Sequence, residues 1–200
     1  MVFLKEAIFT IVFTLFLNII KQILPNCQFL AFADDLKSFK TISSINGCHL
    51  LQSSLDNLVF YLNSLGLSLN VDNCQTMTFT RCLSNIPFQY TINDSTLASV
   101  LSVKDLGIIY TPTLDFYPHI ESSSCRALKV LGFVKRIASE FKLQSLIKLL
   151  YCSLVRSIVE YGLVLWDRHT TSNSLILERV QRRFLSFASY SGPAQAKIVN

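Results

Sequence analysis

The chain has little of what most metal, disulfide and phosphate sites are built from. Its three histidines are isolated, and its cysteines form no C-x-x-C pair, lying at positions 27, 48, 74, 82, 125 and 152. No glycine-rich phosphate loop, internal repeat, low-complexity tract or nucleophile triad is recognisable. These absences exclude a zinc ribbon and a disulfide scaffold, and they predict that the thiols are small core residues of an intracellular protein.

Charged residues are also few, at 16% of 200 residues, whereas half of the chain is hydrophobic. This composition is typical of a folded protein of one or two domains with a sizeable core. Residues 1–119 carry six Lys or Arg and eight Asp or Glu, a net −2, and residues 120–200 carry twelve and five, a net +7. A basic C-terminal part would suit contact with a nucleic acid backbone, and the alternative is an ordinary solvated basic surface.

No apolar run is long enough to make a convincing membrane span. Ala7 to Ile20 is almost wholly apolar but shorter than the ~20 residues that a bilayer requires. No small-residue cleavage site precedes Pro25. Charged and polar side chains interrupt or bound the run at Lys5, Glu6, Asn18 and Lys21. We therefore predict a buried helix and an intracellular protein, in the nucleus or cytoplasm, with no membrane partner; the alternative is a membrane anchor over residues 3–20.

The hydrophobic pattern is mixed at first and helical after Phe116, which predicts an α+β fold. Before Phe116 we predict two strands within 29–39, a helix over 43–65 ended by Gly66, a strand at 76–80, and a hairpin of 88–92 and 96–98 around Asn93-Asp94. Residues 103–110 predict a strand in which Gly107 marks a bulge or a close backbone approach. The predicted later helices are 119–139, 143–160 and 173–190. Trp166 is expected to be buried, and His119 and His169 to be surface or capping residues.

Two adjacent carboxylates, Asp34 and Asp35, lie between two short apolar runs. Aspartate is a poor strand former, and neighbouring like charges repel each other. Two adjacent aspartates are therefore unfavourable here unless another interaction compensates for their repulsion. In a straight strand the two side chains would point to opposite faces, whereas on a tight antiparallel turn both can face one site. Mg²⁺ takes carboxylate oxygens and would neutralise the repulsion. The alternative is that the pair simply marks a polar hairpin turn.

The run Phe32-Ala33-Asp34-Asp35-Leu36-Lys37 resembles the metal-binding hairpin of reverse transcriptases from non-LTR (LINE, Jockey-like) retrotransposons. The likeness covers nearly the whole chain, from about Phe13 to about Tyr190. Further segments resemble the same family in the same order: 12–19, 69–74, 104–107, 118–120, 127–133, 160–162 with Trp166, and 178–185.

The resemblance implies a partial polymerase palm of antiparallel strands with packed helices over 1–115, and an all-α thumb-like region over 116–200. It implies an RNA-directed DNA polymerase in which Asp34 and Asp35 are catalytic ligands of Mg²⁺ in a two-metal mechanism. Its partners would be an RNA template and a DNA primer, with no small-molecule cofactor. Lys104, Leu106 and Gly107 would belong to a primer-grip strand. Nucleic-acid phosphates would be contacted by Lys129, Lys135, Arg136, Arg182 and Arg183.

The chain departs from the family where catalysis is concerned. Asn73 stands where the family has a lysine that is thought to help protonate the leaving pyrophosphate, and Ile19 stands where an aspartate is usual. The third metal-binding carboxylate should come from an earlier strand, yet the only acid before Asp34 is Glu6. The nucleotide-contacting Gln-Gly loop is absent as well. We therefore expect a truncated polymerase fragment that is inactive alone, and the alternative is a nucleic-acid-binding remnant without catalysis.

Overall fold

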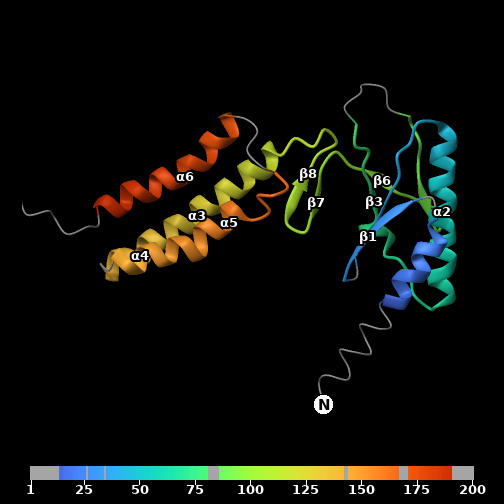
Figure 1. The fold of residues 1–200 in the computed structure, drawn as a ribbon, viewed down its shortest axis with the longest axis horizontal. Coiled ribbons are helices and arrows are strands. Elements are labelled where there is room, and N and C mark those ends of the chain that lie inside the picture. Colours follow the sequence, from blue (N-terminus) through green and yellow to red (C-terminus); the bar gives the residue numbers. More distant parts are fainter. Residues whose placement is uncertain are drawn as a thin grey trace, which may run out of the picture. The chain divides into compact units, whose positions relative to one another are not determined.

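The computed structural model describes residues 14–190 except 26, 34, 81–85, 142–143 and 167–170. The chain divides into two compact units, Met1–Val100 and Leu101–Asn200, which are described separately. Within the described residues the fold is a mixture of α and β, with small two-stranded sheets, helices α2 to α6 and a helical C-terminal half (Figure 1). The predicted α+β class is confirmed at this level.

The first unit combines one long helix with short strands. Its helices are a segment over residues 14–23, α2 (Ile45–Ser64) and the 3₁₀ turn η1 (Val71–Asn73). Its strands are β1 (Gln28–Phe32), β2 (Asp35–Phe39), β3 (Gln75–Thr76), β4 (Thr91–Ile92), β5 (Ser95–Thr96) and β6 (Ala98–Ser99). β1 pairs antiparallel with β2, β4 antiparallel with β5, and β3 parallel with β6. The predicted hairpins at 29–39 and around Asn93-Asp94 are therefore confirmed.

Helix α2 is amphipathic, and its apolar side builds the core of this unit. Leu58 and Leu62, four residues apart, are buried together with Ile20 and Leu24. The helix ends as predicted at Gly66, which has φ +73. The N–H of Gly66 donates to the carbonyl of Asn63, and the N–H of the next residue donates to that of Leu62, which is the Schellman pattern. The side-chain amide of Gln52 also holds β4, donating to Thr91 O and accepting from Thr91 N at 2.9 Å each.

Two predicted strands are much shorter than the sequence pattern indicates. The strand predicted over 76–80 is reduced to β3, and the arms predicted at 88–92 and 96–98 pair over two residues each in β4 and β5. Phe79 has the alternation of a strand residue, yet it is 53% exposed because no sheet face covers it. Alternation alone therefore overestimates strand length where pairing partners are short.

The second unit begins with a hairpin and continues as packed helices. The hairpin is β7 (Val103–Asp105) and β8 (Ile108–Tyr110). The helices are α3 (Tyr117–Phe141), α4 (Gln144–Leu150), α5 (Ser157–Glu160) and α6 (Thr171–Tyr190), with the π-helical turn η2 (Tyr151–Arg156) joining α4 to α5. The helices predicted over 119–139, 143–160 and 173–190 are confirmed within a few residues at each end.

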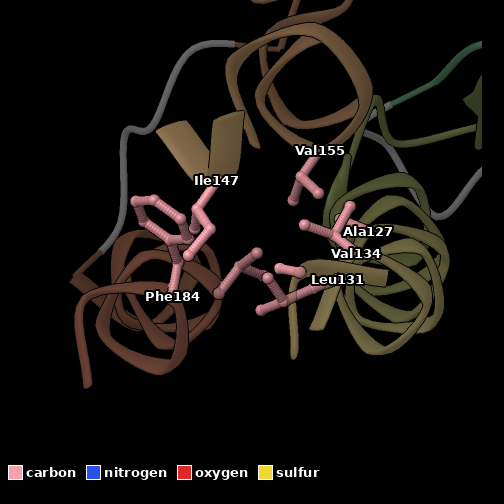
Figure 2. Packing of buried hydrophobic residues seen from close by; sticks show 8 residues of the cluster. Ala127, Leu131, Val134, Ile147, Val155 and Phe184 are labelled. Carbon is pink, nitrogen blue, oxygen red and sulfur yellow. The ribbon is translucent and has the colours of Figure 1, made fainter. Parts of the chain in front are cut away.

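The core of the second unit lies where α3, α4, η2 and α6 meet. Figure 2 shows side chains from all four converging, among them Leu131 and Val134 from α3, Ile147 from α4, Val155 from η2 and Phe184 from α6. Leu131 and Val134 are three residues apart, as the apolar stripe of a helix requires. This core packs α3 against α6. The outward-facing side chains of the two helices therefore lie next to each other.

Among the described residues, no helix is both long and apolar enough to cross a membrane. The apolar run at 7–20 lies partly outside these residues. In the described part, Ile20 is fully buried in the core of the first unit, whereas Leu15 is 57% exposed. The segment from Thr14 to Ile23 thus packs through one side only.

Candidate functional site

The hairpin that carries the adjacent carboxylates has the shortest possible connection. The register pairs Phe32 with Asp35, which leaves two positions of the sequence between the paired residues. Ala33 has φ +52, the left-handed conformation that two-residue hairpin turns require and that costs a residue with a Cβ about 1–2 kcal/mol. Asp34 lies outside the described residues. The predicted antiparallel strands are therefore confirmed, Asp35 is the first residue of β2, and the joint orientation of the two carboxylates stays a prediction.

The two faces of this hairpin differ in burial. Phe29 and Leu36 pack against the core of the first unit, whereas Leu30 and Phe32 are 60% and 59% exposed. Residues directly opposite in an antiparallel pair project from the same face, so Asp35 shares the outer face with Phe32. Asp35 is itself exposed. Its carboxylate therefore lies at the turn end of a solvent-facing surface that also carries Leu30, Phe32 and Lys37.

The metal-ligating side chains among the described residues are too few to bind a magnesium ion by themselves. Across the part of the chain that the structure describes, no three His, Cys, Asp or Glu side chains come close enough to hold a metal. Asp35 is the one described carboxylate of the hairpin. Mg²⁺ demands near-octahedral oxygen ligation, usually from more than one carboxylate or from a carboxylate and phosphates. Asp35 alone therefore does not form a magnesium site in the described part of the hairpin.

Lys104, Leu106 and Gly107, which were predicted to belong to a primer-grip strand, lie at a second hairpin. Residues 103–110 do not form the predicted single strand, because Leu106 (φ +45) and Gly107 (φ +85) make a two-residue turn between β7 and β8. The predicted bulge is therefore wrong. A close approach does occur, since a Cβ at Gly107 would lie 3.2 Å from Tyr161 Cε1. The Tyr161 hydroxyl donates to the Leu106 carbonyl at 2.7 Å, and Lys104 on β7 is exposed.

A basic groove lies between α3 and α6, and we call it the α3–α6 groove. It has a volume of about 430 Å³, and its lining contains four cationic side chains and no acidic one: Lys135, Leu175, Arg179, Arg182, Arg183 and Ser186. Three of the five predicted phosphate-contacting residues line it, namely Lys135, Arg182 and Arg183. The predicted residues Lys129 and Arg136 are exposed on α3 but do not line the groove.

Arg179 is a groove residue that the sequence prediction missed. The signal was present, because 175, 179, 182, 183 and 186 are spaced by three and four residues and fall on one face of a helix. Arg182 Nη2 donates to Glu178 Oε2 at 2.8 Å, and Lys135 Nζ lies 5.3 Å from the centre of the Phe187 ring. The Arg182–Glu178 pair is exposed, so water screens it and the groove keeps its positive field.

A second, smaller cavity of about 270 Å³ lies between η2, α5 and α6. Its polar lining has both signs of charge: Arg156, Glu160, Glu178 and Gln181, with Tyr151 beside them. Arg156 Nε donates to Glu160 Oε1 at 2.6 Å. Burial raises the pKa of Tyr151, whose ring stacks on Phe184 at 3.8 Å. Arg156 pairs with Glu160 within the cavity and Glu178 pairs with Arg182 outside it, so the lining offers no unpaired charge of one sign.

His119 is buried, not a surface or capping residue as predicted. The hairpin β7–β8 covers it, and Ile109 N donates to His119 Nδ1 at 3.4 Å. Ser123 Oγ lies 3.5 Å from its Nε2, and the Trp166 ring centre is 5.6 Å away. Burial, with a smaller contribution from the Arg126 charge, lowers the pKa of His119. Ser123 and His119 are 1% and 2% exposed, so their contact lies inside the core of the second unit.

Of the remaining predictions on single residues, some are confirmed and some are wrong. Trp166 is buried as expected, and its Nε1 donates to Tyr161 O at 2.8 Å. Of the cysteines, Cys48 is a core residue, but Cys125 and Cys152 are exposed, so the prediction of small core thiols is wrong for these two. Both lie on outward faces of the helices that build the second core. His169 and Cys82 lie outside the described residues.

Comparisons of the chain with protein-family models, with curated proteins and with solved structures give no match. The likeness to reverse transcriptases therefore depends on the sequence motifs alone.

Proposed function

We propose that this chain is a fragment of an RNA-directed DNA polymerase, the reverse transcriptase of a non-LTR retrotransposon, and that it is inactive by itself. The observation that supports this most is the adjacent pair Asp34-Asp35 in the sequence, because Asp35 begins β2 directly after the tight turn of the β1–β2 hairpin. Neighbouring carboxylates beside such a turn can reach one site, whereas in a straight strand they would diverge. On this proposal residues 1–115, which comprise the first unit and the β7–β8 hairpin, derive from the polymerase palm, and residues 116–200 with helices α3 to α6 derive from the thumb-like region.

The proposed inactivity follows from the catalytic residues that the polymerase reaction requires. Two-metal phosphoryl transfer needs carboxylates that hold both ions against the attacking and leaving oxygens. Asp34 and Asp35 would supply part of that set. Asn73, the last residue of η1, replaces the lysine expected to act on the leaving pyrophosphate, and an amide cannot donate a proton in that role. Loss of one metal ligand removes several kcal/mol of transition-state stabilisation.

Primer extension tests this function. The purified chain, with Mg²⁺, a DNA primer on an RNA template and all four nucleotides, is expected to add no nucleotide. The variant Asp34→Ala is the control, and it should be indistinguishable from the wild-type chain. Extension by the wild-type chain that Asp34→Ala abolishes would contradict the proposed inactivity, and it would at the same time identify Asp34 as catalytic.

The α3–α6 groove supports a second function, nucleic-acid backbone binding without catalysis. Four cations line one open surface with no acidic neighbour among its lining residues. Phosphates bound there would release condensed counterions, which makes binding independent of sequence and strongly dependent on salt. The net +7 of residues 120–200 adds a long-range attraction of the same sign.

Two arginines of the second unit give a matched test of the groove. Arg182 and Arg156 are both exposed, and both form an i,i+4 pair with a glutamate, but only Arg182 lines the groove. Arg182→Gln should weaken binding to an RNA–DNA duplex roughly 5- to 10-fold at about 0.1 M salt and reduce the salt slope by about 0.9. Arg156→Gln should leave both unchanged. Equal losses in the two variants, or binding that ignores salt, would exclude the groove as the site.

A further inference from the structure

The α3–α6 groove contains one hydroxyl among its cations. Of the residues lining it, Ser186 alone carries a hydroxyl, and its side chain is exposed. Side chains three and four residues apart are neighbours on a helix, so Ser186 lies next to Arg182 and Arg183 on the surface of α6. Lys135 faces the same groove from α3.

We propose that Ser186 is a phosphorylation site, and that a phosphate there closes the α3–α6 groove to nucleic acid. The inference depends on the nucleic-acid-binding function proposed for the same groove. A serine kinase would transfer the γ-phosphoryl group of ATP to Ser186 Oγ. The hydroxyl O–H bond breaks and its proton leaves, a new P–O bond forms, the bond to the bridging oxygen breaks, and ADP is released.

The sequence before Ser186 carries the charge pattern that an arginine-directed kinase selects. Arg183 and Arg182 stand three and four residues before the serine, and Arg179 stands seven before it. Ser189 is also exposed but lacks this pattern, because Leu185 and Ser186 occupy the corresponding positions. Its hydroxyl donates to the Ser186 carbonyl at 3.0 Å. The two serines therefore differ in their flanking charge and not in their exposure.

Ser186 lies near the end of the described part of α6, whose last residue is Tyr190. A kinase needs its substrate segment extended, so Ser186 becomes accessible to it through local opening of the helix. The segment from Arg182 to Ser186 includes the core residue Phe184, so phosphorylation proceeds from a locally opened form of α6.

The added charge acts directly on the groove. A phosphoserine carries about −1.5 to −2 charges and three acceptor oxygens near neutral pH. Arg182 and Arg183 are within reach for charge-assisted hydrogen bonds, so the tethered phosphate competes with those of a nucleic acid. Removing about two counterion-releasing contacts should weaken binding roughly 10- to 100-fold at about 0.1 M salt.

The experiment uses the full chain, an arginine-directed serine kinase with ATP and Mg²⁺, and a fluorescent RNA–DNA duplex. Mass spectrometry should find phosphate on Ser186, duplex binding should weaken as stated, and phosphatase treatment should restore it. The duplex affinity of Ser186→Ala, whatever its starting value, should not change on kinase treatment. Ser189→Ala, the matched control, should respond like the wild-type chain, and Ser186→Glu should bind more weakly without any kinase.

Three outcomes would overturn the proposal, and they are separable. If the chain binds the duplex but the kinase never phosphorylates Ser186, then Ser186 is not a phosphorylation site. A chain phosphorylated on Ser186 that binds the duplex unchanged rejects the switch. An unmodified chain with no salt-dependent binding rejects the groove function itself, and the inference with it.

Discussion

His119 joins the start of α3 to the β7–β8 hairpin through a ring nitrogen that must stay unprotonated. Its Nδ1 accepts the N–H of Ile109, and a proton on that nitrogen would remove the acceptor. Burial and the nearby Arg126 charge both lower the pKa of the imidazole in the folded chain. The same histidine in the unfolded chain keeps an ordinary pKa near 6.5, so the unfolded state takes up protons first as pH falls.

The second unit should therefore lose stability on acidification. The contribution of His119 is fully present above about pH 6.5 and is lost as pH falls through that value toward the lower folded pKa. Urea unfolding measured from pH 8 to pH 5 should show this decrease. In His119→Asn, which keeps an acceptor for Ile109 N–H but does not titrate, the decrease should be smaller. Identical pH profiles for the two chains would show that His119 is not the group responsible.

At the scale of elements, turn residues were the most predictable feature and strand lengths the least. Gly66 and the Asn93-Asp94 turn depend on local φ preference, which a sequence displays directly, and both lie where expected. The turn at Leu106-Gly107 was missed because leucine is a poor residue for φ +45, so the run looked like one continuous strand. The burial of His119 depends on which hairpin packs over α3, and no local pattern contains that information.

A glycine allows the segment after α5 to pack closely against the β8 strand. Gly162 has φ +68, and a Cβ there would lie 2.6 Å from Ile108 Cδ1. Gly162→Ala should therefore lower the free energy of unfolding by about 1–3 kcal/mol through overpacking and backbone strain. Thermal or urea unfolding measures the change.

A second glycine gives the control for this prediction. Gly132 lies inside α3, and the nearest atom to a Cβ there is Arg136 Nη1 at 3.9 Å. Gly132→Ala should be neutral or stabilising by up to about 1 kcal/mol, because alanine favours helix. If both variants lose the same stability, the Ile108–Gly162 contact does not account for the effect.

At the scale of the whole molecule, the two units carry different parts of the proposed function. The first holds the hairpin with Asp34 and Asp35, and the second holds the α3–α6 groove. The sequence predicted the hairpin, because apolar runs flank a pair of poor strand formers, and it predicted three of the four groove cations. It could not give the grouping of Lys135 with the three arginines of α6, since that depends on the packing of α3 against α6.

The central claim is that the β1–β2 hairpin is what remains of a metal site, and paramagnetic line broadening tests it most directly. Carboxylates bind Mn²⁺ as they bind Mg²⁺. In the ¹⁵N-labelled chain, millimolar Mn²⁺ should broaden the amide signals around Phe32 and Asp35, and Asp34→Asn combined with Asp35→Asn should abolish this while leaving the spectrum otherwise folded. Hairpin amides that Mn²⁺ leaves sharp, or broadens equally in the double variant, would contradict the account.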